Sequence, residues 1–288
     1  MTSTSWPLPV HRPPEETLWP ELPIAIGAIK RPILIYLAKK LELWAYSNSN
    51  EIVALSPGMS EGVAKTGYPI ENIHIIPNSS DISFFQLNKK LNIGLQNKYK
   101  WNDEDKIIIY TGTLGEINGV EYLVDIANEF TEINNKVKLL IVGDGIEEQA
   151  IRNKAKIYNC LDNNLFLINQ LPKNKMPGLY NLSTIATSLF IPLKEMEANS
   201  ANKFFDTLAA GKPIVINYGG WQKDLIEKHN IGLVLARDPK VAAKALNELL
   251  KNDELLSIMG KNALSLGKSE FSRDKLADKL INVLESYA

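Results

Sequence analysis

The sequence predicts an α/β fold in which a parallel sheet is wrapped by helices. Two observations lead to this prediction. From Ile107 onward, short β-rich apolar runs alternate with amphipathic stretches, which is the pattern of repeated βαβ units. Upstream, a shorter stretch shows the same alternation. We therefore expect one complete Rossmann-type domain, preceded by part of a second α/β unit.

The expected strands of the complete domain are short and rich in branched residues. They cover residues 107–110, 139–142, 165–168, 185–190, 214–216 and 233–235. Helical periodicity fills the intervals, with Val120, Leu123, Val124 and Ile126 in one segment and residues 204–210 and 241–250 in two others. The pattern of residues 268–288 predicts a terminal helix. Its apolar side, formed by Leu276, Leu280, Ile281 and Leu284, is expected to pack against another part of the protein.

The upstream unit is expected to contribute two strands, residues 52–55 and 73–76. Between them, Ser56-Pro57-Gly58 is typical of a helix start and Gly67 of a helix end. The polar, lysine-rich stretch that follows has no strand signal. We therefore expect a Pro-rich irregular segment over 1–17, a partial α/β domain over 18–84, a connection over 85–104 and the complete domain over 105–288.

Composition excludes several classes of partner. Lys and Arg total 32 against 33 for Asp and Glu, so the formal net charge of −1 offers no field for nucleic acid. The lone cysteine, Cys160, excludes an internal disulfide and fits a reducing cytosol. We expect it to be a small buried or half-buried side chain.

The N-terminal third has no export or membrane-spanning signal. Residues 1–14 carry four prolines and lack the basic start and apolar core of a signal peptide. The apolar tract 22–38 is interrupted by Lys30 and Arg31 and broken at Pro32. Lys39 and Lys40 then lie near Leu34, Leu37, Leu41 and Trp44. This pattern fits a half-buried helix, which we favour, or a helix lying on a membrane surface.

Two glycine turns are candidates for ligand binding, because open parallel sheets bind ligands outside the carboxyl ends of their strands. The first holds Gly112, Thr113, Leu114 and Gly115, and the second holds Gly143 and Gly145. Glycines let backbone amides approach a phosphate, but βα turns also use glycine for geometry alone. Each turn by itself is weak evidence for a site.

A polar helix face after the fourth expected strand is the stronger signal. Asn199, Asn202, Lys203 and Asp206 share about a third of the helical wheel, and Phe204, Phe205, Leu208 and Ala209 lie opposite. If Asn199 or Ser200 caps the helix, Lys203 lies in the first turn, where a cation opposes the helix dipole. A solvated face is the simple alternative. We favour a diphosphate site formed by helix amides and Lys203, with Asp206 accepting hydrogen bonds from a ribose.

Five segments carry a family resemblance through their order and spacing. They are Ile52-Val-Ala-Leu-Ser-Pro-Gly-Met59, Ile75-Ile-Pro-Asn78 with Asp81 and Phe85, Tyr110-Thr-Gly-Thr-Leu-Gly115, Val142-Gly-Asp-Gly145, and Asn202-Lys-Phe-Phe-Asp206 with Gly211-Lys-Pro213. From about Leu18 to the C-terminus they resemble the retaining bacterial glycosyltransferases of group 1, which have two Rossmann domains (the GT-B fold). The resemblance is nearest to transferases of N-acetylated aminosugars such as N-acetylfucosamine in surface-polysaccharide clusters.

This resemblance implies a donor nucleotide sugar in the C-terminal domain, a polysaccharide or lipid-linked acceptor, retained anomeric configuration and no required metal. Asp206 matches the second acid of the family's Glu-x7-Glu signature, which contacts the donor ribose, whereas the first position is Ala198, with Glu195 and Glu197 nearby.

The family's basic clamp falls on Thr113 and Asn118-Gly119, so phosphate charge is left to helix amides, Thr113 and Lys203. The base is expected near Gln170-Leu171-Pro172, and the aminosugar likeness suggests UDP. The donor-binding set is Gly112, Thr113, Leu114, Gly115, Gly143, Gly145, Leu171, Asn199, Ser200, Asn202, Lys203 and Asp206.

The resemblance also implies that the N-terminal, acceptor-side domain is truncated. We therefore expect either a short enzyme, a chain completed by a partner protein, or a nucleotide-sugar-binding module without turnover. A nucleotide-sugar epimerase of the same architecture is a third and weaker interpretation. No catalytic residue can be named, because His11, His74 and His229 are scattered and fit structural or solvated roles. The expected location is the cytoplasm, with a peripheral position at the inner membrane face as an option.

Overall fold

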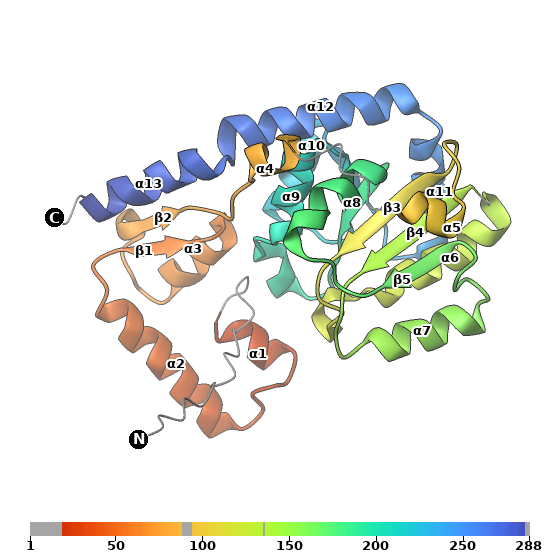
Figure 1. The fold of residues 1–288 in the computed structure, drawn as a ribbon. Helices are drawn as coiled ribbons and strands as arrows, with labels where there is room; N and C mark the ends of the chain where they lie inside the picture. The colour runs from red at the N-terminus through yellow and green to blue at the C-terminus, as the bar shows by residue number, and fades with distance from the viewer. Residues whose placement is uncertain (1–18, 88–93, 135, 286–288) are drawn as a thin grey trace, which may run out of the picture.

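A computed structural model describes residues 19–87, 94–134 and 136–285, and it contains two parallel sheets (Figure 1). The larger sheet has six strands in the order β5-β4-β3-β6-β7-β8, and the smaller has the two strands β1 and β2. The predicted α/β fold with a parallel sheet is confirmed. The expected irregular segment 1–17 lies outside the described residues.

The six strands follow the predicted ones closely. They are β3 (Lys106–Thr111), β4 (Val137–Val142), β5 (Leu165–Ile168), β6 (Ile185–Ser188), β7 (Ile214–Ile216) and β8 (Gly232–Val234). β3 pairs with β4 over its whole length and with β6 on its other side. β6 ends at Ser188, two residues before the predicted end, because its register with β7 stops there. The strands are apolar on both sides, as parallel strands covered on two faces require.

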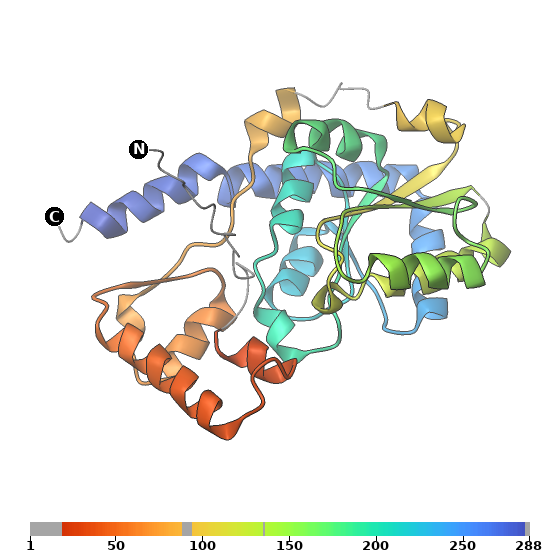
Figure 2. The ribbon, with the colours of Figure 1, turned by 60° about the horizontal axis from the view of Figure 1, so that its bottom comes forward.

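Helices cover both faces of the larger sheet (Figures 1 and 2). One face packs against α6 (Glu121–Ile133), α7 (Glu148–Ile157) and α11 (Pro239–Leu250). The other packs against α8 (Met176–Leu182), and α9 (Asn202–Ala210) joins α10 (Trp221–His229) and α12 (Asp253–Glu270) in a neighbouring part of the core. Short 3-10 turns lie at Glu116–Asn118 (η2), Lys173–Lys175 (η3) and Lys194–Ala198 (η4). Cys160 is fully buried in this core, as expected.

The stretch expected as a connection, in which no strand was predicted, contains helices. It holds α4 (Ile82–Leu87) and α5 (Leu95–Tyr99), and Phe85, Leu95 and Trp101 are buried against the larger sheet. The apolar periodicity did not predict these helices, because apolar residues are sparse in this stretch. Their buried side chains complete the core on one face of the larger sheet.

The C-terminal stretch differs from the single helix that was predicted. α12 runs through Lys268 to Glu270, and α13 (Arg273–Glu285) begins after a break at Phe271 and Ser272. At this break the chain bonds the upstream unit, with Ser80 N donating to Phe271 O (2.7 Å) and Arg273 pairing with Asp81 (2.6 Å). Leu276 is buried there, but Leu280, Ile281 and Leu284 are exposed, so the predicted docking of α13 is only partial.

The upstream unit is small. β1 (Ile52–Ala54) and β2 (Ile73–Ile75) pair in parallel, with α3 (Pro57–Lys65) and the turn η1 (Ile70–Asn72) between them. Ser56 caps α3 as predicted, accepting a hydrogen bond from Met59 N at 3.1 Å. α1 (Glu21–Ala25) and α2 (Pro32–Ser47) precede this unit. No described helix is long and apolar enough to cross a membrane.

α2 contradicts the favoured interpretation of this segment as a half-buried helix. Its predicted apolar side, which includes Leu34, Leu37, Leu41 and Trp44, is 48–64% exposed. Its buried side chains are Ala38 and Glu42 instead. Within the described residues, nothing covers the apolar side.

Lys212 ties the end of α9 to the end of α8. It follows Gly211, which closes α9 in the left-handed region (φ 67°), and its Nζ donates to Ser183 O (2.6 Å) and Asn181 O (3.1 Å). Burial lowers the pKa of Lys212 from its ordinary 10.5 to about 8. The folded protein therefore holds this proton less tightly than the unfolded chain does.

This shift predicts a pH-dependent contribution to stability. The cost of burying the charge is complete below the folded pKa and vanishes as pH rises toward the unfolded value. Relative to Lys212→Met, the wild type should gain up to about 3 kcal/mol in unfolding free energy between about pH 8 and pH 10.5. Urea unfolding across this range measures the difference, and the exposed Lys228→Met is the matched control. A flat difference for Lys212→Met would show that the two carbonyls hold the pKa at its ordinary value.

Candidate functional site

The turns after β3, β4 and β5 meet at the carboxyl edge of the larger sheet, as predicted. Leu114 N donates to Asp144 O (2.9 Å), and Glu147 N donates to Leu114 O (2.9 Å). Gln170, after β5, donates its backbone N–H to the Asp144 carboxylate (3.2 Å). These bonds fasten three turns that are distant in sequence into one surface.

The glycines of this surface are there for close packing. A Cβ on Gly143 would lie 1.8 Å from Gly112 O, and one on Gly145 would lie 2.3 Å from Leu114 O. Only a hydrogen fits at either position. Gly112 itself has φ 136°, a conformation that suits glycine. In both turns, glycine is therefore needed for close packing of the backbone. Gly112 and Thr113 lie on the exposed rim of this surface.

Lys203 reaches from α9 to the turn after β3. Its Nζ lies 3.3 Å from Tyr110 Oη and 4.9 Å and 5.3 Å from the ring centroids of Tyr110 and Phe190. With the Asn118 amide oriented to satisfy both of its atoms, its oxygen accepts from Lys203 Nζ (3.2 Å) and its nitrogen donates to Thr113 O (3.0 Å). The Lys203 ammonium thus lies beside Asn118, a position at which the resembling family has a basic residue and this sequence does not.

α9 begins later than predicted. Its first residue is Asn202 and its N-cap is Ala201, which offers no side-chain cap. The expectation that Asn199 or Ser200 caps this helix is therefore wrong. Lys203 still lies in the first turn, so the opposition between its charge and the helix dipole remains. Phe204, Phe205, Leu208 and Ala209 are fully buried, which confirms the predicted apolar face.

Asn199 and Ser200 lie inside the protein, fully buried. Asn199 accepts a hydrogen bond from Ala201 N (3.1 Å) and donates to Met196 O (2.5 Å). Ser200 Oγ accepts from Asn78 N (3.2 Å), and the Asn78 amide donates to Ser200 O (2.5 Å). These contacts favour a role in shaping the loop, and direct donor contact by either side chain stays a prediction.

The upstream unit holds this loop through further hydrogen bonds that sequence reasoning missed. Ser56 Oγ donates to Ala198 O (2.6 Å), and Ser80 Oγ donates to Phe205 O (2.8 Å). The signal lay in the Ser56-Pro-Gly segment, which was assigned only a helix start, and in Pro77-Asn78, which was used only for the family resemblance. A short polar side chain does not reveal a partner more than a hundred residues away.

Ala198, which replaces the first family acid, is enclosed by α3. A Cβ added to Gly58 would lie 2.9 Å from Ala198 Cβ, so the two backbones approach closely here. Glu197 does not stand in for it. Its carboxylate lies 3.1 Å from where a Cβ on Gly219 would be, beside the start of α10.

Asp206 lies one helical turn beyond Lys203 and is half-buried. Burial raises the pKa of Tyr180, and the charge of Asp206 adds to that rise, which places the carboxylate near this hydroxyl. Tyr180 Oη is 3.1 Å from Thr111 Oγ1 at the end of β3. Asp206 therefore faces the same strand end as Lys203. Of the other predicted residues, Asn202 is exposed, Leu171 is partly buried, and the Leu114 side chain is fully enclosed in the core.

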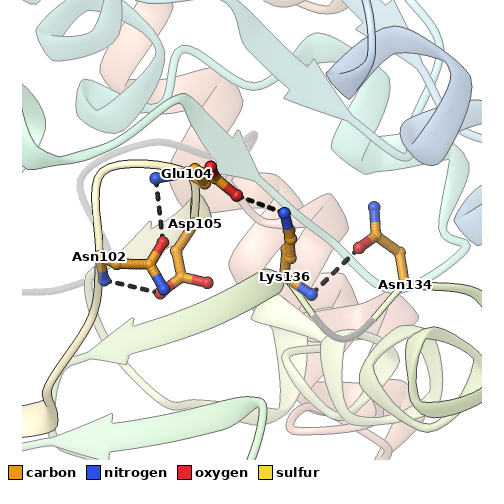
Figure 3. A network of polar contacts seen from close by, with 5 residues as sticks. All are labelled: Asn102, Glu104, Asp105, Asn134 and Lys136. Carbon is orange, nitrogen blue, oxygen red and sulfur yellow. Dashed lines mark hydrogen bonds and ion pairs between the residues drawn. The ribbon is translucent and has the colours of Figure 1, made fainter.

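A hollow of about 600 Å³ lies at the opposite, amino edge of β3, β4 and β5. Figure 3 shows the polar network at its rim, in which Asn102 N donates to Asp105 (2.9 Å), Glu104 N donates to Asn102 (3.0 Å) and Lys136 pairs with Glu104. These contacts fix the loops that lead into β3 and β4. The hollow is distinct from the convergence of Lys203 and Asp206.

Neither a metal-binding cluster nor a histidine is found at this site among the described residues. Across residues 19–87, 94–134 and 136–285, no group of three or more His, Cys, Asp or Glu side chains is placed to hold a metal ion. His74 pairs with Glu51 (2.7 Å), and His229 ends α10. His11 lies outside the described residues.

Comparison with known proteins shows which family this chain resembles. The model of the family described as Glycosyl transferases group 1 matches residues 94–265. Spore coat protein SA of Bacillus subtilis is 24% identical over 188 residues, 62% of this chain and 48% of its own. Alpha-D-kanosaminyltransferase of Streptomyces kanamyceticus is 23% identical over 192 residues, 63% of this chain and 46% of its own. The chain thus spans about half the length of these relatives.

The fold has a clear counterpart among solved structures. HepE of Anabaena, crystallised with UDP and glucose, superposes with a TM-score of 0.70 at 15% identity, over 84% of this chain and 65% of that one. This likeness confirms the expected GT-B-like fold.

The packing of the two glycine turns can be tested by adding one methyl group. Gly143→Ala should lower the unfolding free energy by about 2 kcal/mol or more, because the Cβ meets the Gly112 carbonyl. Gly115→Ala is the matched control, since its φ is −107° and its nearest contact would be an ordinary 3.5 Å. Chemical denaturation measures both. Equal stability of the two variants would mean that the turns are not locked together.

Proposed function

Because this chain belongs to the glycosyl transferases group 1 family, we propose that it transfers a sugar from a nucleoside-diphosphate sugar to a glycan or lipid-linked acceptor. The observation that carries the proposal is the position of Lys203. It brings a cation from the first turn of α9 to the glycine turn after β3, where the family's own basic clamp is missing. A diphosphate bound there would meet the Lys203 ammonium and the positive end of the α9 dipole, and both favour negative charge.

In the proposed donor site, the diphosphate binds between the start of α9 and the rim formed by Gly112 and Thr113. α9 begins at Asn202, and the first-turn amides of a helix point along its axis in a direction that favours an anion. Asp206 would accept hydrogen bonds from the ribose hydroxyls. The base would lie by Leu171, beside the Asp144 turn, with Gly143 and Gly145 keeping that turn close to the backbone of the first.

We propose a UDP-linked, N-acetylated aminosugar as the donor. UDP is supported by HepE, which was crystallised with UDP and glucose, and an aminosugar by the Streptomyces relative, which is named as a kanosaminyltransferase. The acceptor would be a growing polysaccharide or a lipid-linked sugar.

The proposed mechanism retains the anomeric configuration and uses no protein nucleophile. The bond from the anomeric carbon to the phosphate oxygen breaks, and the acceptor oxygen bonds that carbon on the same face. The acceptor proton passes to the leaving phosphate oxygen. Lys203, Thr113 and the α9 amides would stabilise the negative charge that develops on the diphosphate. No metal is required in this scheme.

A binding module without turnover is the second candidate. It is favoured by Ala198, which leaves the first family acid without a substitute. In this case the acceptor side would come from a partner protein. We place either form in the cytoplasm, with a peripheral position at the inner membrane face.

The donor site can be tested by titrating UDP into the protein in a calorimeter. Lys203→Met and Asp206→Ala should each weaken binding by about tenfold or more, because each removes a charge-assisted contact. Lys228→Met, which removes an exposed lysine of α10, should bind as the wild type does. Wild-type affinity in both site variants would remove these residues from the donor site.

Turnover separates the two candidate functions. A transferase should consume at least one of a panel of UDP-, GDP- and TDP-sugars in the presence of acceptor lipids, as followed by mass spectrometry, and its rate should be unchanged by EDTA. A binding module should bind UDP and consume none of the panel. A rate abolished by EDTA and restored by a divalent cation would contradict the metal-free mechanism.

A further inference from the structure

The side chains of α2 are distributed in the reverse of the usual way. The helix turns Ala38 and Glu42 toward the rest of the protein, whereas most of its large apolar side chains face outward. These outward side chains are Ile33, Leu34, Tyr36, Leu37, Leu41, Leu43 and Trp44, which are 43–64% exposed. α2 lies at the outer edge of the molecule in both views (Figures 1 and 2). An exposed apolar surface of this extent is typical of a binding surface.

The charge of this surface has one sign. Lys30, Arg31, Lys39 and Lys40 are all exposed. The single acid between residues 30 and 47 is Glu42, which is only 7% exposed on the inner side of the helix. Burial raises the pKa of Glu42, and the nearby charge of Glu21 adds to the rise. The outward surface therefore combines apolar side chains with four cations and no exposed acid.

The position of Lys40 helps to decide whether a protein, a second copy of the chain or a membrane binds this surface. Its neighbours on the helix, three and four residues away on either side, are Tyr36, Leu37, Leu43 and Trp44, and all are exposed. Its ammonium lies 5.7 Å from the centroid of the Tyr36 ring. A dry apolar protein surface would bury this charge unpaired, which is unfavourable. A second copy of the chain would bring four more cations to the contact.

A membrane surface with anionic lipids accommodates both features. Apolar side chains enter the boundary between head groups and acyl chains, while lysine stems lie along it with their ammonium groups at the phosphates. Tyr36 and Trp44 belong to the residue types that concentrate at this boundary. At 16 residues, α2 is about 24 Å long and suits a position in the plane of the membrane.

We propose that α2 docks this protein on the surface of membranes that contain anionic lipids. This inference deepens the proposed function, because it names the surface on which a lipid-linked acceptor would be met. Vesicle binding needs neither donor nor acceptor. Failure of this proposal and failure of the transferase assignment can therefore be told apart.

The test is co-sedimentation of the full chain with vesicles. Binding to phosphatidylcholine vesicles containing 30% phosphatidylglycerol should exceed binding to pure phosphatidylcholine vesicles by about tenfold or more and should fall at high salt. Lys39→Glu combined with Lys40→Glu should remove most of the difference. Leu37→Ser combined with Trp44→Ser should weaken binding to both kinds of vesicle. These side chains are exposed, and thermal unfolding checks that the variants stay folded.

A matched control comes from α7, where Lys156 and Ile157 are both exposed. Lys156→Glu combined with Ile157→Ser should bind vesicles as the wild type does. Tryptophan emission should shift to the blue on anionic vesicles in the wild type and not in Trp44→Phe. Equal binding to both kinds of vesicle, or no loss in the α2 variants, would overturn the proposal. So would a dimer in light scattering that the α2 variants dissociate, because α2 would then be a contact between copies.

Discussion

The close approach of two glycine turns is the constraint on which the candidate site depends. Gly143 can lie against the Gly112 carbonyl only because it has no side chain. This contact brings the ends of β3 and β4 together at one edge and leaves Gly112 and Thr113 exposed. Lys203 then extends over the same edge, with its Cε 3.5 Å from where a Cβ on Gly112 would be. Close backbone packing, together with the hydrogen bonds between the turns, thus shapes the place where a diphosphate is proposed to bind.

α9 connects this edge to the rest of the molecule. Its apolar side is fully buried and fixes the helix, while its polar side presents Lys203 and Asp206. Its leading loop is hydrogen-bonded to the upstream unit by Ser56 and Asn78. These hydrogen bonds hold the loop before α9 and the upstream unit together. The close approach of Gly58 to Ala198 belongs to the same contact.

The proposed membrane surface fits this arrangement. α2 belongs to the same upstream region as β1 and α3, and Ser56 at the start of α3 bonds the loop before α9. A transferase with a lipid-linked acceptor needs that acceptor near the donor, and diffusion confined to a surface increases encounters between them. The positive charge of α2 would then favour cellular membranes rich in anionic lipids. The buried Glu42 keeps the one acid of this segment away from that surface.

The sequence by itself determined the strands, the parallel sheet and the polar side of α9, because local apolar periodicity and glycine punctuation encode them directly. It also placed Lys203 in the first turn of a helix, although the capping residues were wrong. The tertiary structure alone decided which partners these residues have. Lys203 meets Tyr110 from 93 residues away, and Asn78 bonds Ser200 from 122 residues away. The exposure of α2 was likewise beyond the sequence, since an apolar helical stripe looks the same whether a protein covers it or not.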